Sequence, residues 1–160
     1  MRILVAAVGR LRDGPEHQLI EDYGARIRSG GRAISISAFE IVEVEAPKGL
    51  AGAARQAKEA ALVAEASANA TRRIALDERG KDLSSEALAR ILGQWRDEGA
   101  REIAFLIGGA DGHDEATRRR SDLVLSFGRA TWPHMLARAM LAEQIYRVMT
   151  ILSGHPYHRA

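Results

Sequence analysis

The 160-residue sequence predicts an α/β domain built on a mainly parallel sheet with helices on both faces. Short runs rich in valine, isoleucine and leucine alternate along the chain with longer amphipathic segments, which is the pattern of consecutive strand–helix–strand units. No repeat, low-complexity segment or linker interrupts this alternation. We therefore expect a single domain that spans residues 1–160.

The first half of the chain predicts two strands and two helices. Residues 2–8 form a compact apolar run, and residues 17–28 place their apolar side chains on one helical face. Apolar residues alternate from Ile34 to Ala38 and continue to Val44, which predicts a long second strand. Residues 50–69 are rich in alanine, a strong helix former.

The second half adds three strands and two helices before the last long helix. Residues 72–76, 102–107 and 122–127 are short and rich in β-branched or apolar residues, as strands are. Ser84 is a good N-cap for a helix that ends near Gly99, because its hydroxyl can accept a backbone N–H. Asp114 is expected to cap a shorter helix in the same way.

A long helix is expected from Pro133 to about Leu152, since proline is favoured as the first helical residue. Its polar residues fall in two places, with Arg138 roughly opposite Arg147. A helix with two apolar flanks fits two arrangements. It can be a central helix of one domain, or it can lie between its own sheet and another subunit.

Composition narrows the class of protein. The chain has no cysteine, which excludes disulfides and thiolate chemistry and fits a cytoplasmic protein. No stretch reaches the roughly 20 apolar residues of a membrane span. The net charge is only +2, but residues 118–160 carry seven arginines against two carboxylates. This basic segment predicts one face turned toward phosphate, although a charge run such as 118–120 is by itself usually solvated surface.

Three unusual loops follow predicted strands, at residues 76–77, 108–112 and 127–132. In an open parallel sheet, ligands bind beyond the carboxyl ends of the strands. Glycines there allow a ligand to approach the backbone closely, but they also mark ordinary turns. The residues alone therefore indicate a crevice for a nucleotide-like ligand and leave its identity open.

The chain ends in His155-Pro-Tyr-His-Arg-Ala160, a dense group of ring and guanidinium side chains. Such groups stack on bases, bind phosphate and move protons, so we expect a functional tail rather than a frayed one. The spacing of His155 and His158 is not interpreted as a metal site, because no carboxylate lies near it in sequence.

Several motifs together resemble one known family. They are residues 127–138, 143–147 and 155–159, preceded by Leu-Asp-Glu-Arg-Gly-Lys at 76–81 and Leu-Ile-Gly-Gly-Ala-Asp-Gly at 106–112. In this order and spacing they are similar to the RlmH family, the ribosomal RNA large-subunit methyltransferases H of the SPOUT superfamily. The likeness is tight after residue 74 and looser before it.

This resemblance implies a C-terminal trefoil knot, a homodimer, and a pocket for S-adenosylmethionine. Threaded chains are otherwise almost absent from proteins, so only the resemblance leads to the knot. The expected cofactor-binding residues lie in the three loops and are Leu76, Gly108, Phe127, Gly128, Arg129, Ala130, Thr131 and Trp132. No metal is expected.

The resemblance also implies N3-methylation of a pseudouridine in the RNA of the large ribosomal subunit. N3 carries a proton that must leave before the nitrogen can attack, so the site needs a base or a stabilising cation. His158 is expected to handle the proton, with Arg147 and Arg159 holding phosphate or the anionic base. Tyr157 is expected to stack or hydrogen bond, and Glu143 to orient Arg147 from one helical turn away.

Two other functions stay open at this point. One is a non-catalytic protein that binds RNA or the ribosome through the basic segment alone. The other is a nucleotide hydrolase that uses Asp111 and His113 beside the glycine loop. Glu143 and Arg147 also have a plainer interpretation as a surface helix pair worth about 0.3–0.5 kcal/mol.

Overall fold

The computed structural model describes residues 1–159, with side chains for residues 1–157. Its strands are β1 (Arg2–Val8), β2 (Ala38–Val44), β3 (Arg72–Asp82), β4 (Glu102–Ile107) and β5 (Leu123–Ser126). Its helices are α1 (Pro15–Gly30), α2 (Gly52–Ala66), α3 (Ser85–Asp97), α4 (Glu115–Arg120) and α5 (His134–Ser153), and two 3₁₀ turns are η1 (Gly31–Ile34) and η2 (Pro156–Arg159).

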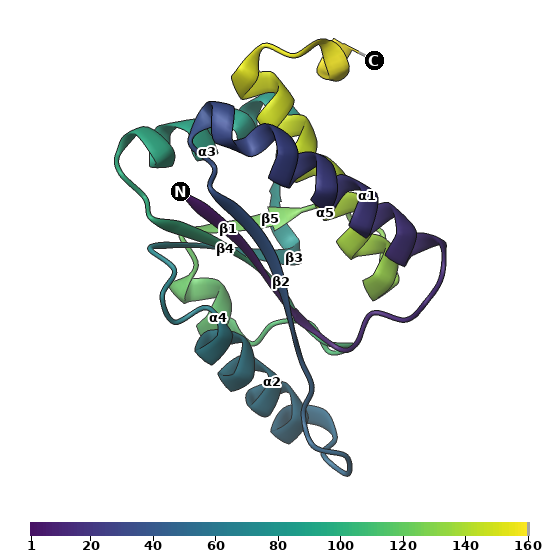
Figure 1. The fold of residues 1–160 in the computed structure, drawn as a ribbon. Helices are drawn as coiled ribbons and strands as arrows, with labels where there is room; N and C mark the ends of the chain where they lie inside the picture. The colour runs from purple at the N-terminus through teal and green to yellow at the C-terminus, as the bar shows by residue number, and fades with distance from the viewer. Residues whose placement is uncertain (160) are drawn as a thin grey trace.

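The five strands form one sheet in the order β2-β1-β4-β3-β5, and every neighbouring pair is parallel. Helices α1, α3 and α5 cover one face of the sheet, and α2 and α4 lie on the other (Figure 1). The structure thus confirms the predicted α/β fold class. Within the described residues, no helix combines the length and the apolar character that a bilayer crossing needs.

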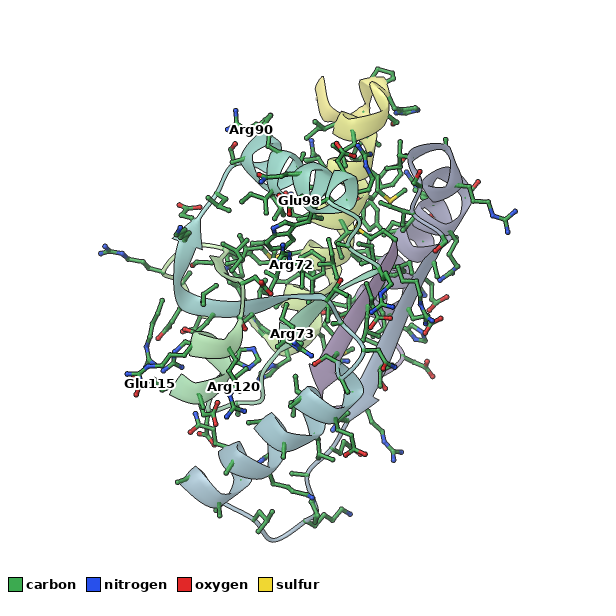
Figure 2. The ribbon with its side chains drawn as sticks, turned by 90° about the vertical axis from the view of Figure 1, so that its left-hand side faces the viewer. Arg72, Arg73, Arg90, Glu98, Glu115 and Arg120 are labelled. Atoms are coloured by element: carbon green, nitrogen blue, oxygen red, sulfur yellow. The ribbon has the colours of Figure 1, made fainter. Side chains whose placement is uncertain are left out.

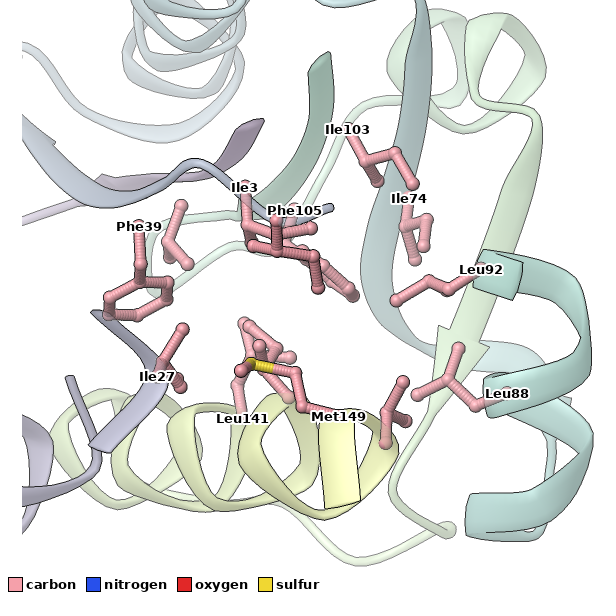
Figure 3. Packing of buried hydrophobic residues seen from close by; sticks show 14 of the residues in the cluster. Ile3, Ile27, Phe39, Ile74, Leu88, Leu92, Ile103, Phe105, Leu141 and Met149 are labelled. Carbon is pink, nitrogen blue, oxygen red and sulfur yellow. The ribbon is translucent and has the colours of Figure 1, made fainter. Parts of the chain in front are cut away.

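The larger core lies between the sheet and the layer of α1, α3 and α5 (Figure 3). Strand residues such as Ile3 and Phe105 meet Leu141 and Met149 of α5, all of them buried. Burying a side chain of this size stabilises the fold by about 1.5–3 kcal/mol. A smaller core, which includes Val63 of α2, packs on the opposite face.

The predicted caps of two helices are confirmed. The hydroxyl of Ser84 accepts a hydrogen bond from the N–H of Ala87 at 3.2 Å, and the carboxylate of Asp114 accepts one from the N–H of Thr117 at 2.7 Å. Gly99 follows α3 with a φ of +88°, a left-handed conformation that glycine adopts without strain. Local sequence therefore fixes the ends of α3 and the start of α4.

The second strand is shorter than the alternation predicted. Residues 31–34 form the 3₁₀ turn η1, and Ser35 adopts a left-handed φ of 63°. The pairing of β2 begins where Ala38 lies opposite Arg2, and just before it the N–H of Ser37 donates to the carbonyl of Met1 at 2.9 Å. The N–H of Ile36 bonds instead to the carbonyl of Gly31 at 2.8 Å.

Strand β3 is longer than predicted and contains an irregularity. Its pairing with β5 runs to Leu76 opposite Leu125, and resumes with Lys81 opposite the same residue. Residues 77–80 of β3 therefore bulge out of its pairing with β5. Gly80 lies so close to β5 that a β-carbon would meet the carbonyl carbon of Leu125 at 2.6 Å. This bulge forms one wall of the candidate site.

Helix α5 packs on the sheet between α1 and α3. It begins at His134, and Pro133 is its N-cap rather than its first residue. The Arg138 side chain is buried, whereas that of Arg147 remains 23% exposed. The helix is thus a central element of its own chain, and a further contact with another subunit stays a prediction.

Candidate active site

A cavity of about 350 Å³ opens beyond the carboxyl ends of β3, β4 and β5. Its walls are the β3 bulge, the glycine loop after β4, and the loop between β5 and α5. The first turns of α5 close it from one side through His134 and Ala137. All three loops that stood out in the sequence therefore meet at one place.

Seven of the eight residues expected to bind the cofactor line this cavity, namely Leu76, Gly108, Phe127, Gly128, Ala130, Thr131 and Trp132. Arg129 belongs to the same loop but is not among the lining residues. The indole N–H of Trp132 donates to the carbonyl of Phe127 at 3.2 Å, while 41% of the residue is exposed. The indole therefore ties the ends of the loop together at the rim of the cavity.

The glycine loop is compact because its glycines touch protein rather than open space. A β-carbon on Gly108 would lie 2.9 Å from the carbonyl carbon of Gly112 and 3.0 Å from the nitrogen of His113. A β-carbon on Gly109 would run into the carboxylate of Glu59 on α2. Gln56, one turn earlier on α2, donates to the carbonyl of Asp111 at 2.9 Å. Helix α2 therefore packs against this loop and fixes its position.

Two opposite charges lie inside the cavity wall. Asp77 Oδ2 is 3.3 Å from Arg118 Nη1, and the side chains are only 7% and 18% exposed. The other carboxylate oxygen of Asp77 accepts from the N–H of Arg79 at 3.0 Å. Arg118 also donates to the carbonyl of His113. This ion pair therefore joins the β3 bulge to the glycine loop.

His113 is fixed inside the protein. The residue is 4% exposed, and its Nε2 lies 3.0 Å from the carbonyl oxygen of Leu106. Burial lowers the pKa of His113 below its ordinary value, because the charged form loses its hydration. A ring held against a backbone carbonyl is poorly placed as a general base, which counts against the hydrolase that uses Asp111 and His113. Within the described residues, no group of three or more His, Asp and Glu side chains is placed to hold a metal ion.

The predicted residues of α5 and the tail form a second cluster. Glu143 Oε1 accepts from Arg147 Nε at 2.9 Å and from the Tyr157 hydroxyl at 3.1 Å. The guanidinium of Arg147 lies 5.0 Å from the centre of the Tyr157 ring. The tail, within the described residues, is therefore folded back onto α5.

Two further tyrosines extend this cluster. The Tyr157 ring packs edge-on against Tyr146 at 4.8 Å, and Tyr146 lies 5.9 Å from Tyr23 of α1. The hydroxyl oxygens of Tyr23 and Tyr157 are 3.3 Å apart. Burial raises the pKa of Tyr157, with the hydrogen bond to Tyr23 and the charge of Glu143 acting in the same direction. Tyr157 therefore stays a neutral hydroxyl near pH 7.

The cluster and the cavity are separate within one chain. Ala137 lines the cavity, and Arg147 lies ten residues further along α5, which is roughly 15 Å at the rise of an α-helix. The side chains of His158 and Arg159 lie outside the described residues. The structure thus brings Glu143, Arg147 and Tyr157 together outside this cavity. Of the three, Glu143 shares the lining of a neighbouring cavity with Phe127.

The sequence did not single out several residues of the cavity and of the cluster formed by α5 and the tail. Asp77 and Arg118 were present only as parts of a motif and of a charge run, and Tyr23 appeared only as one apolar position of a helix. Of the three arginines of α4, Arg118 turns inward and Arg119 pairs with Glu115. Arg120 stays exposed, and Figure 2 labels it together with Glu115. A contiguous charge run therefore divides into three different roles, and the inward turn of Arg118 depends on a residue 41 positions earlier, Asp77.

A parallel α/β sheet with a ligand-sized cavity beyond three strand ends is the arrangement in which proteins commonly bind nucleotides and cofactors. The family model described as "Predicted SPOUT methyltransferase" matches residues 1–158, so the chain belongs to the SPOUT methyltransferase family. A solved structure of a probable methylase family protein from Haemophilus influenzae Rd KW20 has a similar fold, with a TM-score of 0.52 and 11% identity. That likeness covers 98% of this chain and 69% of the other.

Relatives of known name are far closer in sequence. The protein named "Ribosomal RNA large subunit methyltransferase H" from Rhodospirillum centenum is 53% identical over 160 residues, covering 100% of both chains. Its namesake from Brucella anthropi is 48% identical over the same length, again with 100% of both chains covered. Full-length identity at this level confirms the family resemblance read from the motifs, and it makes this chain an S-adenosylmethionine-dependent methyltransferase.

Proposed function

We propose that this protein methylates N3 of a pseudouridine in the RNA of the large ribosomal subunit. The names of the full-length relatives support large-subunit ribosomal RNA as the substrate. The observation that carries the proposal is the meeting of the three loops, after β3, β4 and β5, around one cavity. The choice of base rests on the family resemblance.

The cavity suits S-adenosylmethionine in size. Its volume of about 350 Å³ falls within the range of small-molecule sites. Leu76, Gly108 and the loop at 127–132 would hold the cofactor, largely through backbone groups and the Phe127 and Trp132 rings. When bound, the cofactor supplies an electrophilic methyl group. The protein supplies orientation, which is worth a large part of the barrier in such transfers.

The tail cluster would prepare the base. A protonated N3 is a poor nucleophile, so His158 would take its proton, and Arg159 and Arg147 would stabilise the resulting anion. Arg147 is already oriented by Glu143 at 2.7 Å. Because its pKa is raised, Tyr157 would act as a neutral hydrogen-bond donor or stacking surface rather than as a base.

The separation of cluster and cavity supports a composite site in a cytoplasmic homodimer. The tail of one subunit would then meet the cofactor loops of its partner, with the C-terminal segment threaded as a SPOUT knot. Two-fold dimers are the commonest closed oligomers, and they place the same helix on both sides of the interface. Light scattering at micromolar concentration should give twice the chain mass of 17.4 kDa. A monomer mass would remove the composite site.

Methyl transfer tests the function directly. Bacterial ribosomes whose target base is a pseudouridine or a uridine are incubated with the protein and a radiolabelled methyl donor. Label in large-subunit RNA, stronger for pseudouridine, is the expected result. A protein that binds the cofactor yet never labels this RNA would refute the proposal. A thermal-shift screen with S-adenosylmethionine, ATP and magnesium separates it from the RNA-binding and hydrolase alternatives, because ligands of the native state raise its melting temperature.

A further inference from the structure

The ion pair of Asp77 and Arg118 is the most unusual charged feature of the cavity. Both residues line the cavity, and both side chains are more than four-fifths buried. A buried pair is weak evidence for stability, because removing both charges from water offsets most of their attraction. A comparable pair on α4, Arg119 with Glu115, lies at the surface with side chains 77% and 67% exposed. Burial of the first pair therefore calls for another explanation.

Both charged groups keep hydrogen-bonding capacity for a ligand. Arg118 makes its two hydrogen bonds, to Asp77 and to the His113 carbonyl, through Nη1. Its Nε and Nη2 have no hydrogen-bond partner within the described part of the chain, yet they are not buried away from solvent. Each oxygen of Asp77 accepts one hydrogen bond, whereas a carboxylate has about four acceptor sites.

We propose that Asp77 and Arg118 bind the amino-acid end of S-adenosylmethionine. This end is a zwitterion, so its ammonium group matches the Asp77 carboxylate and its carboxylate matches the Arg118 guanidinium. Arginine binds carboxylates through two parallel N–H groups, which is the capacity that remains free here. The inference rests on the proposed function, because it assigns one part of the same cofactor site.

The position of the pair agrees with this assignment. The β3 bulge and the glycine loop form the charged side of the cavity, and the ion pair joins them. The loop at 127–132 forms the other side with Phe127, Ala130 and Trp132. A polar amino-acid end and a flat adenine ring would therefore find different walls. The pair would act as a specificity determinant that separates the full cofactor from adenosine compounds lacking the amino acid.

Two ligands test this division by calorimetry. S-Adenosylhomocysteine carries the zwitterion, whereas 5′-methylthioadenosine has the same adenosine and thioether but no amino acid. We expect Asp77→Asn and Arg118→Met each to lower the affinity for S-adenosylhomocysteine by about 10- to 100-fold, which is the range for the loss of a charge-assisted hydrogen bond. Affinity for 5′-methylthioadenosine should be unchanged. Glu115→Gln and Arg119→Gln, which disrupt the surface pair of the same helix, should alter neither ligand.

The outcomes separate the inference from the proposed function. An equal loss of both ligands in the Asp77 and Arg118 variants would mean that the pair only holds the two loops, and it would overturn the inference. Unchanged affinity for S-adenosylhomocysteine would overturn it as well. A wild-type protein that binds neither ligand would instead contradict the cofactor site itself. Arg118→Lys keeps the positive charge but loses the two parallel N–H groups of the guanidinium. If the other variants do not fold, this variant provides the same test, because it should lose affinity for S-adenosylhomocysteine and keep affinity for 5′-methylthioadenosine.

Discussion

Arg138 of α5 reaches Glu43 at the end of β2, with 2.8 Å between its Nη1 and the carboxylate Oε1. Its Nη2 donates to the carbonyls of Val8 and Gly9, each at 2.6 Å. The Arg138 side chain is 2% exposed, and burial lowers the pKa of the guanidinium against the opposing effect of Glu43. One side chain thereby joins the carboxyl ends of β1 and β2 to the helix whose first turn lines the cavity.

Removing Arg138 should destabilise the protein strongly. Arg138→Met removes a donor from two backbone carbonyls and leaves Glu43 Oε1 with only the N–H of Leu11. Breaking a buried pair in this way costs about 3–5 kcal/mol. The measurement is urea unfolding followed by circular dichroism. Glu43→Gln keeps an acceptor oxygen but removes the charge that compensates the buried guanidinium, so it should also destabilise the protein, by up to about 3–5 kcal/mol. An Arg138→Met protein as stable as wild type would show that these contacts do not hold α5.

The burial of His113 predicts a pH dependence of stability. Its pKa is lowered in the folded state, so below about pH 6.5 the unfolded chain binds a proton that the folded protein resists. Stability from this group is therefore complete above that pH and is lost as the pH falls, by at most about 1.4 kcal/mol per pH unit. The difference between wild type and His113→Gln in free energy of unfolding should shrink from pH 7.5 to pH 5. His17→Gln, at a partly exposed site on α1 beside Asp13, is the comparison variant. A wild-type-to-His113→Gln difference that does not change with pH would contradict the prediction.

Gly108→Ala should lose cofactor affinity without losing the fold. The added β-carbon would press on the backbone of Gly112 and His113, so the glycine loop must move away from its present path. Calorimetry with S-adenosylhomocysteine measures the effect. Gly30→Ala is a matched control, because its β-carbon would make only an ordinary contact with Met149 at 3.9 Å. Unchanged affinity in Gly108→Ala would place the cofactor elsewhere.

Local signals in the sequence predicted much of the fold. Ser84 and Asp114 cap helices because their side chains bond to backbone N–H groups within three residues. Strand β4 was predicted with its observed bounds, because a fully buried strand is apolar along its whole length. The alternation at Ile34 and Ile36 misled because both residues are buried in a turn rather than in a strand.

Long-range contacts account for what the sequence could not predict. The β3 bulge depends on where β5 pairs, and the inward turn of Arg118 depends on Asp77, which lies 41 residues earlier. The hydroxyls of Tyr23 and Tyr157 meet across 134 residues. Single-residue patterns carry no signal for such pairs. The meeting of the three loops around one cavity was nevertheless predicted, because parallel strands bring their carboxyl ends to one edge.

Deletion of the C-terminal tail tests the composite site most directly. Deleting residues 155–160 should leave affinity for S-adenosylhomocysteine nearly intact, because none of the cavity residues is touched. Methyl transfer to ribosomes should nearly cease, since both RNA positioning and proton handling are removed. His158→Ala should mainly lower the rate of the chemical step, whereas Arg159→Ala should mainly weaken RNA binding and reduce its dependence on salt.

Tyr23→Phe supplies a finer control for the same tail. It keeps the ring that packs against Tyr146 but removes the hydroxyl that lies 3.3 Å from Tyr157. If Tyr23 positions the tail, this variant should keep cofactor affinity and stability while the rate of methyl transfer falls by less than in the deletion.

Subunit mixing tests the composite site more sharply. An inactive variant of the cofactor site and an inactive variant of the tail are combined in one preparation. Heterodimers with one intact composite site should recover activity, because a cofactor pocket from one chain would then face a tail from the other. Mixtures that stay inactive after subunit exchange, or a tail-deleted protein that methylates at the wild-type rate, would end the composite-site account.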